Sequence, residues 1–170
     1  MKIFCYGAGT TLEDIGWQVY LGLVALLAGS AFFSASETAF ATVNTIRLKN
    51  YADAGDKKAA MALKIAEMYE KTLSSILIGN NLVNIAISSI AAVLFTSWMG
   101  NAGTWVSTVV VTIVVLIFGE ILPKTFAKEH SEKVALGVCG VLLAFITVLT
   151  PVSFLFLKMQ HGFINLFKGE

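Results

Sequence analysis

The sequence has little charge and few residues of the kind that hold transition metals. Only 14% of its 170 residues are charged, against about 25% in soluble domains, and its mean hydropathy is +0.78. This composition excludes a water-soluble globular domain. The two cysteines, Cys5 and Cys139, lie far apart and lack metal-ligand spacing, so we expect free thiols. His130 and His161 fall outside the polar cluster identified below, so zinc or haem ligation is not expected.

Signals for catalysis and for nucleic-acid binding are also missing. The sequence has no Ser/His/Asp arrangement, no glycine-rich phosphate loop and no CxxC motif, so we expect no enzyme. The net charge is only +1, no basic cluster with interleaved aromatics occurs, and no nucleic-acid partner is expected. The opening MKIFCYGAGTTLEDIG lacks the pattern of a signal peptide.

What the sequence does have is long apolar runs. Each is near or above the roughly 20 residues that cross a hydrocarbon core of about 30 Å as a helix. Helix is the expected state, because an open sheet would leave backbone groups unpaired in lipid. The segment between the first two runs predicts a cytoplasmic amphipathic linker, with Met61, Ile65, Met68 and Tyr69 on one face. The runs cover about residues 17–43, 73–99, 104–122 and 134–157, and the linker covers 47–71.

The basic residues predict the orientation in the membrane. They gather in the linker, after the third run (Lys124, Lys128, Lys133) and after the fourth (Lys158, Lys168), and the turn MGNAGT between runs two and three has none. Basic loops remain cytoplasmic, so the N-terminus is expected outside a plasma (inner) membrane. The predicted outer ends carry Trp17, Trp98 and Trp105, as expected of interfacial aromatic residues.

The fourth run does not fit a further crossing as well as the others. A crossing would place Lys158 and Lys168 outside. We therefore predict a juxtamembrane belt helix over 134–157 on the cytoplasmic side, broken at Pro151, with a cytoplasmic C-terminus. A fourth crossing, which length alone favours, is the alternative. The predicted fold is all-α and integral to the membrane: three transmembrane helices and this belt helix, in one domain over residues 1–160.

Polar residues inside the runs predict a site. Counted from the nearest tryptophan at the rise of an α-helix, Ser34 lies about 25 Å deep, Asn84 about 21 Å and Glu120 about 22 Å. Oxygen groups on three helices thus fall at one level of the inner half of the membrane, where polar side chains need a partner or a cavity. The runs also carry Ser36, Glu37, Asn80, Asn81 and Ser88, of which Asn80, Asn84 and Ser88 share one helix face.

Such hard oxygen ligands suit Mg²⁺, Ca²⁺ or Na⁺. Several members have alternative explanations. Ser36 and Ser88 could bond the helix backbone, and the asparagines could bridge helices. Glu37 could pair with Arg47 or Lys49, and Glu120 with Lys124. Pro123 is expected to end the third helix, so that backbone carbonyls near it become free to face an ion.

Three motifs, FFSASETAF, SILIGNNLVNIAISS and FGEILPKTFAKEH, stand in that order at the ends of three runs. Together they resemble the transmembrane domain of the CNNM (cyclin M-like)/CorC family of magnesium and cobalt efflux proteins, over about residues 12–160. The resemblance implies a homodimer of three-helix subunits with a belt helix. It also implies a cytoplasm-facing cation site formed by Ser34, Asn84 and Glu120, assisted by Asn80 and by backbone carbonyls.

The resemblance also implies the function. Family members are thought to export Mg²⁺ in exchange for Na⁺, and they usually continue into cytosolic CBS domains that bind adenine nucleotide. Residues 161–170 would begin the linker to such a region, so nucleotide would act only through a domain that this chain lacks. The predicted function is Mg²⁺ efflux coupled to Na⁺ influx. The alternatives are a non-transporting scaffold or Mg²⁺ sensor that regulates another transporter, and a passive cation channel.

Overall fold

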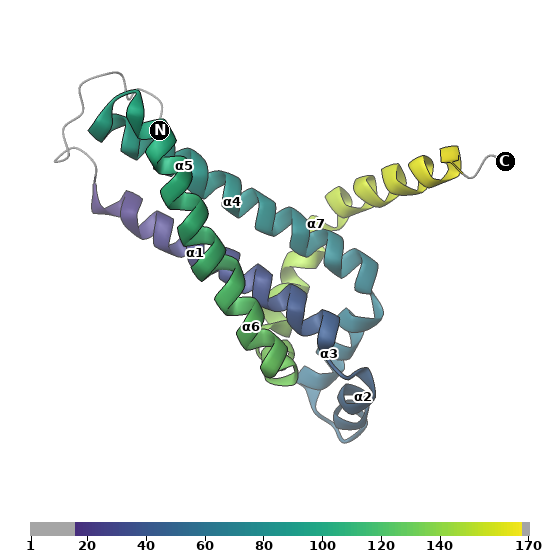
Figure 1. Cartoon of the computed structure of the whole chain (residues 1–170). Coiled ribbons are helices and arrows are strands. Elements are labelled where there is room, and N and C mark those ends of the chain that lie inside the picture. The colour runs from purple at the N-terminus through teal and green to yellow at the C-terminus, as the bar shows by residue number, and fades with distance from the viewer. Residues whose placement is uncertain (1–15, 168–170) are drawn as a thin grey trace.

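The computed structural model describes the backbone of residues 16–167 and the side chains of residues 16–150 (Figure 1). Every element within that range is a helix, which agrees with the predicted all-α class. In chain order the helices are α1 (Trp17–Thr42), α2 (Thr45–Asp53), α3 (Lys57–Glu67), α4 (Tyr69–Met99), α5 (Ala102–Val114), the π-helix η2 (Val115–Ile121), α6 (Leu122–Glu129) and α7 (Ser131–Phe167). The predictions for residues 1–15, Cys5 and the side chains beyond residue 150 lie outside the described part.

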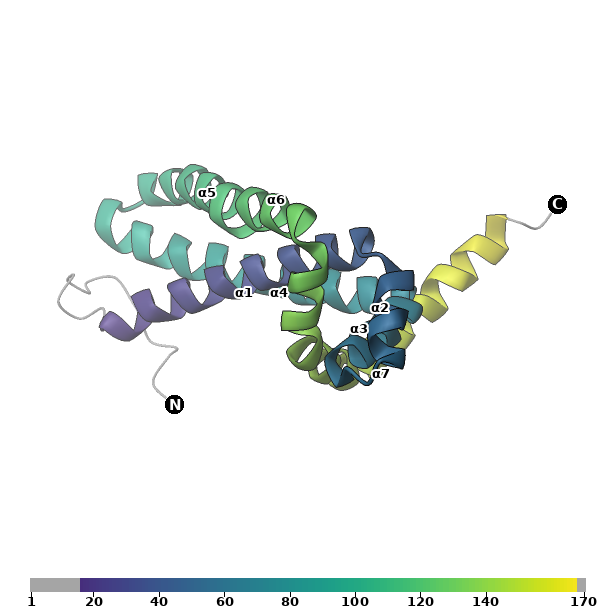
Figure 2. The ribbon, with the colours of Figure 1, turned by 90° about the horizontal axis from the view of Figure 1, so that it is seen from below.

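Three long helical segments form the body of the molecule (Figures 1 and 2). They are α1, α4 and the continuous third segment α5–η2–α6. α1 packs on α4, and α5 packs on α4 near the connecting turn, whereas η2 and α6 pack on α1. The third segment therefore contacts α4 at its start and α1 along the rest of its length. α7 packs on α1, α3 and α4.

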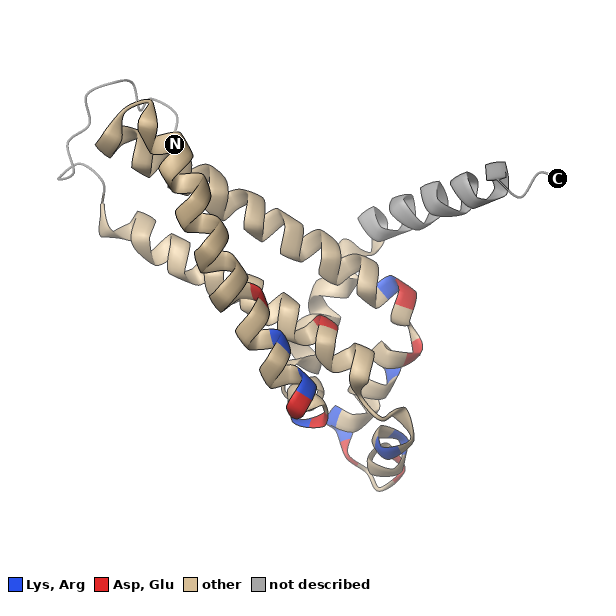
Figure 3. Cartoon of the chain, in the orientation of Figure 1, with Lys and Arg blue, Asp and Glu red and all other residues tan. Residues whose placement is uncertain are grey.

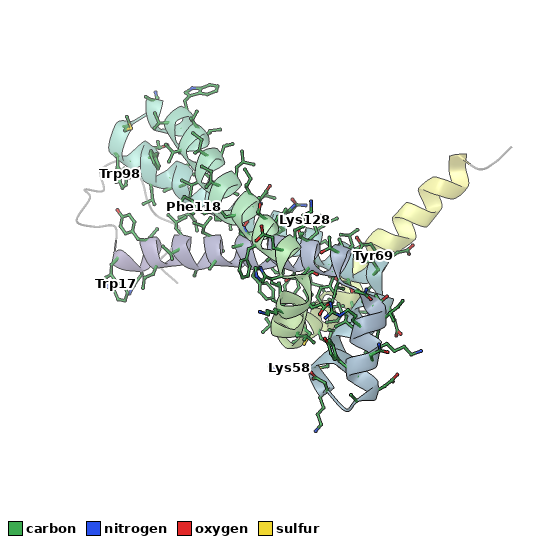
Figure 4. All side chains as sticks on the ribbon, turned by 60° about the horizontal axis from the view of Figure 1, so that its bottom comes forward. Trp17, Lys58, Tyr69, Trp98, Phe118 and Lys128 are labelled. Carbon is green, nitrogen blue, oxygen red and sulfur yellow. The ribbon has the colours of Figure 1, made fainter. Side chains whose placement is uncertain are left out.

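The two ends of this bundle differ in chemistry. Trp17 and Trp98 lie at one end, and Lys58 and Tyr69 lie at the other (Figure 4). Most of the described Lys, Arg, Asp and Glu residues gather at the second end, on α2, α3, α6 and the neighbouring ends of α4 and α7, and Glu37 of α1 and Glu120 of η2 are the others (Figure 3). We call these the tryptophan end and the charged end. The separation agrees with the charge asymmetry from which the orientation was predicted.

Within the described residues, four helical segments are long and apolar enough to cross a membrane. They are Trp17–Thr42, Tyr69–Met99, Ala102–Glu129 and Ser131–Thr150. The first matches the predicted run, and the second and third extend beyond theirs toward the charged end. Length and composition alone allow the fourth to cross, so the predicted belt helix remains a prediction. The helix does not end at Pro151, because α7 continues to Phe167, but the yellow C-terminal part of α7 runs in a different direction from the green part (Figures 1 and 2).

The segment predicted as a linker forms two capped helices. The Asn44 side chain accepts a hydrogen bond from the Arg47 amide at 3.1 Å, and the Asp56 carboxylate accepts one from the Lys58 amide at 2.8 Å. These side chains satisfy orphan amides at the starts of α2 and α3. Gly55, with φ of +96°, makes the turn between the two helices. The buried face of α3 comprises Ala59, Ala62 and Ile65, and the predicted face member Tyr69 is exposed at the start of α4.

Two glycines allow the helices to approach closely. A methyl group on Gly79 of α4 would lie 2.6 Å from the Phe33 ring of α1 and 2.7 Å from the Phe145 ring of α7. Those two rings are themselves in contact, with centroids 4.7 Å apart. At the tryptophan end, a methyl group on Gly103 of α5 would overlap the backbone of Phe95. The α4–α5 hairpin therefore packs backbone against backbone.

The linker is tied to α7 by one charged contact. The Arg47 guanidinium lies 2.9 Å from the Glu132 carboxylate and donates a hydrogen bond of 3.4 Å to the Tyr51 hydroxyl. The Tyr51 hydrogen bond, and then the negative charge of Glu132, raise the pKa of Arg47 above its ordinary value. Arg47 therefore remains charged at any physiological pH.

Candidate cation site

Three helices meet at Ser30, a residue that the sequence analysis did not single out. Ser30 of α1 is fully buried. Its Oγ lies 2.8 Å from Oδ1 of Asn84 and 3.2 Å from Oδ1 of Asn80, both on α4. A hydroxyl has one proton to donate, so only one of these carboxamide oxygens can accept it, and the other amide must turn its NH₂ toward Ser30. Asn80 and Asn84 thus share one polar contact, as their spacing of four residues predicts.

The π-helix η2 closes this contact from the third side. A methyl group on Gly119 would lie 2.8 Å from the Ser30 Oγ, and Gly119 itself is buried. Any larger residue at position 119 would push η2 away from α1. We name the place where α1, α4 and η2 meet, defined by Ser30, Ser34, Asn80, Asn84 and Gly119, the three-helix seam.

Ser34 lies one helical turn from Ser30 toward the charged end. Its side chain is fully buried, and its Oγ has no hydrogen-bond partner among the described residues. A serine in a helix commonly bonds the carbonyl four residues earlier, as Ser36 does with Phe32 at 2.7 Å. A buried hydroxyl without a partner costs about 1–3 kcal/mol. The Ser34 oxygen is therefore available to a bound species at a place where the fold leaves it unsatisfied.

Glu120 follows Gly119 directly and is half-buried. It forms neither an ion pair nor a hydrogen bond with any residue of the described range. The alternative pairing with Lys124 is not present, because the Lys124 ammonium lies 3.1 Å from the Glu37 carboxylate. The alternative pairing of Glu37 with Arg47 is not present either, because Arg47 contacts Glu132. The Glu120 carboxylate is thus unpaired within the described part of the chain, one residue after Gly119 of the seam.

Pro123 does not end the third helix as the sequence predicted. It lies in the first turn of α6, which continues to Glu129, and the irregular part of the helix precedes it. Leu122 donates its N–H to the carbonyl of Ile117, five residues earlier. The carbonyl of Phe118 would bond Leu122 in an α-helix and residue 123 in a π-helix. The Leu122 N–H is bonded to Ile117 instead, and Pro123 has no N–H. The Phe118 carbonyl therefore lacks both of the backbone donors that a regular helix would provide.

The remaining candidate residues lie away from the seam contacts. Asn81 is exposed on α4, and Ser88 is exposed and donates to the Asn84 carbonyl at 2.9 Å. Ser36 is buried but bonded to its own helix. Among the described residues no group of three or more His, Cys, Asp or Glu side chains comes together. The seam offers neutral hydroxyl and amide oxygens, and the Glu120 carboxylate and the Phe118 carbonyl belong to η2, the helix that closes it. Oxygen groups of these kinds are hard ligands.

The sequence pointed to Ser34, Asn80, Asn84 and Glu120 and missed Ser30 and Gly119. A signal for Ser30 was available, because it precedes Ser34 by four residues and shares its helix face. No sequence pattern marked Gly119, because the direction in which residue 119 faces depends on the π-helical turn in which it lies. π-helical turns occur frequently at functional sites, and a sequence pattern does not mark them.

The helices, the charge asymmetry and the polar seam define a multi-pass, all-helical membrane domain. Residues 21–170 match the family described as the Cyclin M transmembrane N-terminal domain. The chain belongs to this family, and the resemblance drawn from its three motifs is thereby confirmed.

Curated relatives agree with this family. A UPF0053 protein of Haemophilus influenzae is 39% identical over 137 residues, covering 81% of this chain and 33% of the relative. The UPF0053 inner membrane protein YfjD of Escherichia coli is 43% identical over 106 residues, covering 62% and 25%. The polyamine export protein of H. influenzae is 27% identical over 165 residues, covering 89% and 38%. The chain thus spans between a quarter and two fifths of these relatives.

Proposed function

We propose that this domain exports Mg²⁺ from the cytoplasm in exchange for Na⁺, with the ion bound at the three-helix seam. One observation carries the proposal. The partnerless hydroxyl of Ser34 and the unpaired carboxylate of Glu120 lie on two helices that meet at the Ser30–Gly119 contact. A fold that leaves an acid and a buried hydroxyl unsatisfied beside an amide pair is suited to a cation that satisfies them.

Each ligand would have its own role. Glu120 would supply the main negative charge, and Ser34 and Asn84 would supply neutral oxygens. Asn80 and the Phe118 carbonyl are further oxygens within the same seam. The Ser30 hydroxyl lies 2.8 Å from the Asn84 carboxamide oxygen, so a cation would compete with Ser30 for that oxygen.

The chemistry of the seam favours a compact ion over a polyamine. The polyamine export protein is a relative at 27% identity, so a polyammonium substrate is the natural rival. An extended polyamine carries several ammonium groups, each needing acceptors of its own, and the seam offers a single carboxylate. Small hydroxyl, amide and carbonyl oxygens around one acid suit octahedral coordination of Mg²⁺ at about 2.1 Å.

The membrane arrangement belongs to the same proposal. We place the tryptophan end outside an inner membrane and the charged end in the cytoplasm, with α1, α4 and α5–η2–α6 crossing. α7 would serve as the belt helix on the cytoplasmic side, and both seam serines would open toward that side. The relative named as an inner membrane protein supports this location. A homodimer, and nucleotide control only through a cytosolic region, are proposed on the family likeness alone.

The test is ion flux in liposomes that contain the purified chain and an Mg²⁺-sensitive dye. With an opposing Na⁺ gradient we expect Mg²⁺ movement that is lost in Glu120→Gln. Glu70→Gln is the matched control, because Glu70 is an exposed acid at the start of α4, outside the seam. Normal flux in Glu120→Gln would refute the site assignment.

The same preparation separates the rival functions. Flux without any need for Na⁺ would identify a passive channel. Binding of Mg²⁺ without flux under any gradient would identify a sensor or scaffold. Spermidine that moves in a Glu120-dependent manner, while Mg²⁺ does not, would identify a polyamine carrier.

A further inference from the structure

Beyond the seam, toward the tryptophan end, the side chains that line the space between the same three helices are apolar. One turn beyond Ser30 lies Leu27 on α1, one turn beyond Asn84 lies Ile87 on α4, and one turn beyond Gly119 lies Val115 in η2. Ile87 is 5% exposed and Val115 is 8% exposed, and Leu27 is half-buried. All three line an apolar groove of about 200 Å³ that runs between the same helices.

The wall of this groove on the third segment consists of valines. Val110, Val111 and Val114 of α5 precede Val115 along it. A β-branched side chain has essentially one χ1 rotamer in a helix, so this wall is stiff. Polar groups return only beyond the groove, where the hydroxyls of Thr96 and Thr104 lie 3.2 Å apart. The path between the helices is thus polar at the seam, apolar in the middle and polar again at the tryptophan end.

We infer that Leu27, Ile87 and Val115 form the outward barrier of the transport path, and that the valine-walled groove is its outer continuation. This inference rests on the proposed function, because it assumes that an ion leaves the seam toward the tryptophan end. The groove extends from Ile87 to Phe95 along α4, about 12 Å at the rise of an α-helix. An ion meets no oxygen over that distance, and an apolar constriction of this kind excludes both water and ions.

The position of the barrier explains why one seam can serve both sides of a membrane. From the charged end, the polar residues Glu37 and Lys124 lead to the seam. From the tryptophan end, every residue that lines the groove is apolar. Release to the outside therefore requires that α1 separate from the other two helices at Leu27, rather than a change in the ligands themselves.

The experiment compares polar substitutions inside and outside the groove, in the full chain in liposomes. Ile87→Ser and Val115→Ser place a hydroxyl at the barrier, and Val109→Ser places one on α5 outside the groove, where the side chain is 61% exposed. The readout is passive entry of Mg²⁺ and of Na⁺ without an opposing gradient. A hydroxyl in the constriction is expected to raise the leak about tenfold, which corresponds to a lowering of the barrier by about 1.4 kcal/mol. Val109→Ser is expected to match the unmodified chain.

Each variant is also made together with Glu120→Gln, and its unfolding in detergent is followed to confirm that it is folded. A leak in Ile87→Ser and Val115→Ser that survives Glu120→Gln supports the barrier, even if the unmodified chain moves no Mg²⁺ and the proposed function fails. Folded barrier variants that leak no more than Val109→Ser overturn the inference, even if the unmodified chain exports Mg²⁺. Equal leaks in all three variants overturn it as well, since the groove would then have no special role.

Discussion

The Lys124 ammonium of α6 lies 3.1 Å from the Glu37 carboxylate of α1, and not beside Glu120, which precedes Lys124 by four residues on its own helix. In a regular helix a Glu followed four residues later by Lys is a favoured pair. Here the pair joins two helices instead, and Glu120 has no ion-pair partner among the described residues. The ion pair also joins α6 to α1 on the side of the seam that faces the charged end.

Exchange of these two charges tests whether the pair joins the helices. Both side chains are partly exposed, at 39% for Lys124 and 27% for Glu37, so each single charge reversal should cost about 1 kcal/mol or less of unfolding free energy. The double variant Glu37→Lys with Lys124→Glu should recover most of that loss. Thermal unfolding of the three variants in detergent measures the coupling. Additive losses in the double variant would show that the contact contributes nothing.

Ser34→Ala should change stability and ion affinity in opposite directions. The hydroxyl is buried without a partner among the described residues, so its removal should raise the free energy of unfolding of the ion-free protein by about 1 kcal/mol. The same change should weaken Mg²⁺ binding, because a ligand is lost.

Ser36→Ala is the control for that experiment, since the Ser36 hydroxyl is equally buried but bonded to Phe32. It should not gain stability and should not lose Mg²⁺ affinity. Isothermal titration and thermal unfolding, measured on both variants, provide the comparison. A Ser34→Ala protein that is less stable without ions and binds Mg²⁺ normally would contradict the role given to this hydroxyl.

Pro123→Ala should weaken Mg²⁺ binding without unfolding the protein. Alanine restores an N–H that can donate to the Phe118 carbonyl, which lacks both regular donors when residue 123 is proline. If that carbonyl helps to hold the ion, affinity should fall by about tenfold, in the range seen when supporting groups of metal sites are changed. Titration with Mg²⁺ is the measurement. Unchanged affinity would remove the carbonyl from the proposed ligand set.

Gly79→Ala should destabilise the bundle where α1, α4 and α7 meet. The added methyl group would lie 2.6 Å from Phe33 and 2.7 Å from Phe145, and such overpacking costs about 1–3 kcal/mol. Gly137→Ala in α7 is the matched control, because no atom lies within 4 Å of its added methyl group. It should be neutral or stabilising, through the higher helix propensity of alanine. Thermal unfolding in detergent should rank the variants in that order.

Cysteine labelling from outside the cell decides whether α7 crosses the membrane. In a background of Cys5→Ser and Cys139→Ala, an impermeant thiol reagent should label Asn101→Cys in the turn between α4 and α5. It should not label Ala54→Cys in the linker or Gly169→Cys beyond α7 until the membrane is opened. External labelling of Gly169→Cys would establish a fourth crossing and exclude the belt helix.

Composition and periodicity sufficed to predict the helices, the linker and the asymmetry of charge, because burial of apolar helices in lipid leaves few alternatives. They also sufficed for Asn80 and Asn84, whose spacing alone places them on one face. They failed where the backbone departs from a regular helix. The π-helix ahead of Pro123 redirects Gly119 and leaves Glu120 unpaired, and neither the phase of a π turn nor the partner of Lys124 follows from spacing along one helix. The role of Ser30 could not be predicted either, because it depends on contacts with two other helices, α4 and η2.

The close approach of Gly103 to the Phe95 backbone has a mechanical consequence. Backbone packed on backbone cannot slide without breaking the contact, so α4 and the third segment share a fixed pivot at the tryptophan end. Their relative motion is then a rotation, whose displacement grows with distance from that pivot. Glu120 lies 17 residues from Gly103, about 25 Å along a helix, so a swing of about 5° would carry its carboxylate about 2 Å. A small rotation of the α4–α5 hairpin at Gly103 would therefore displace Glu120 more than any residue between them.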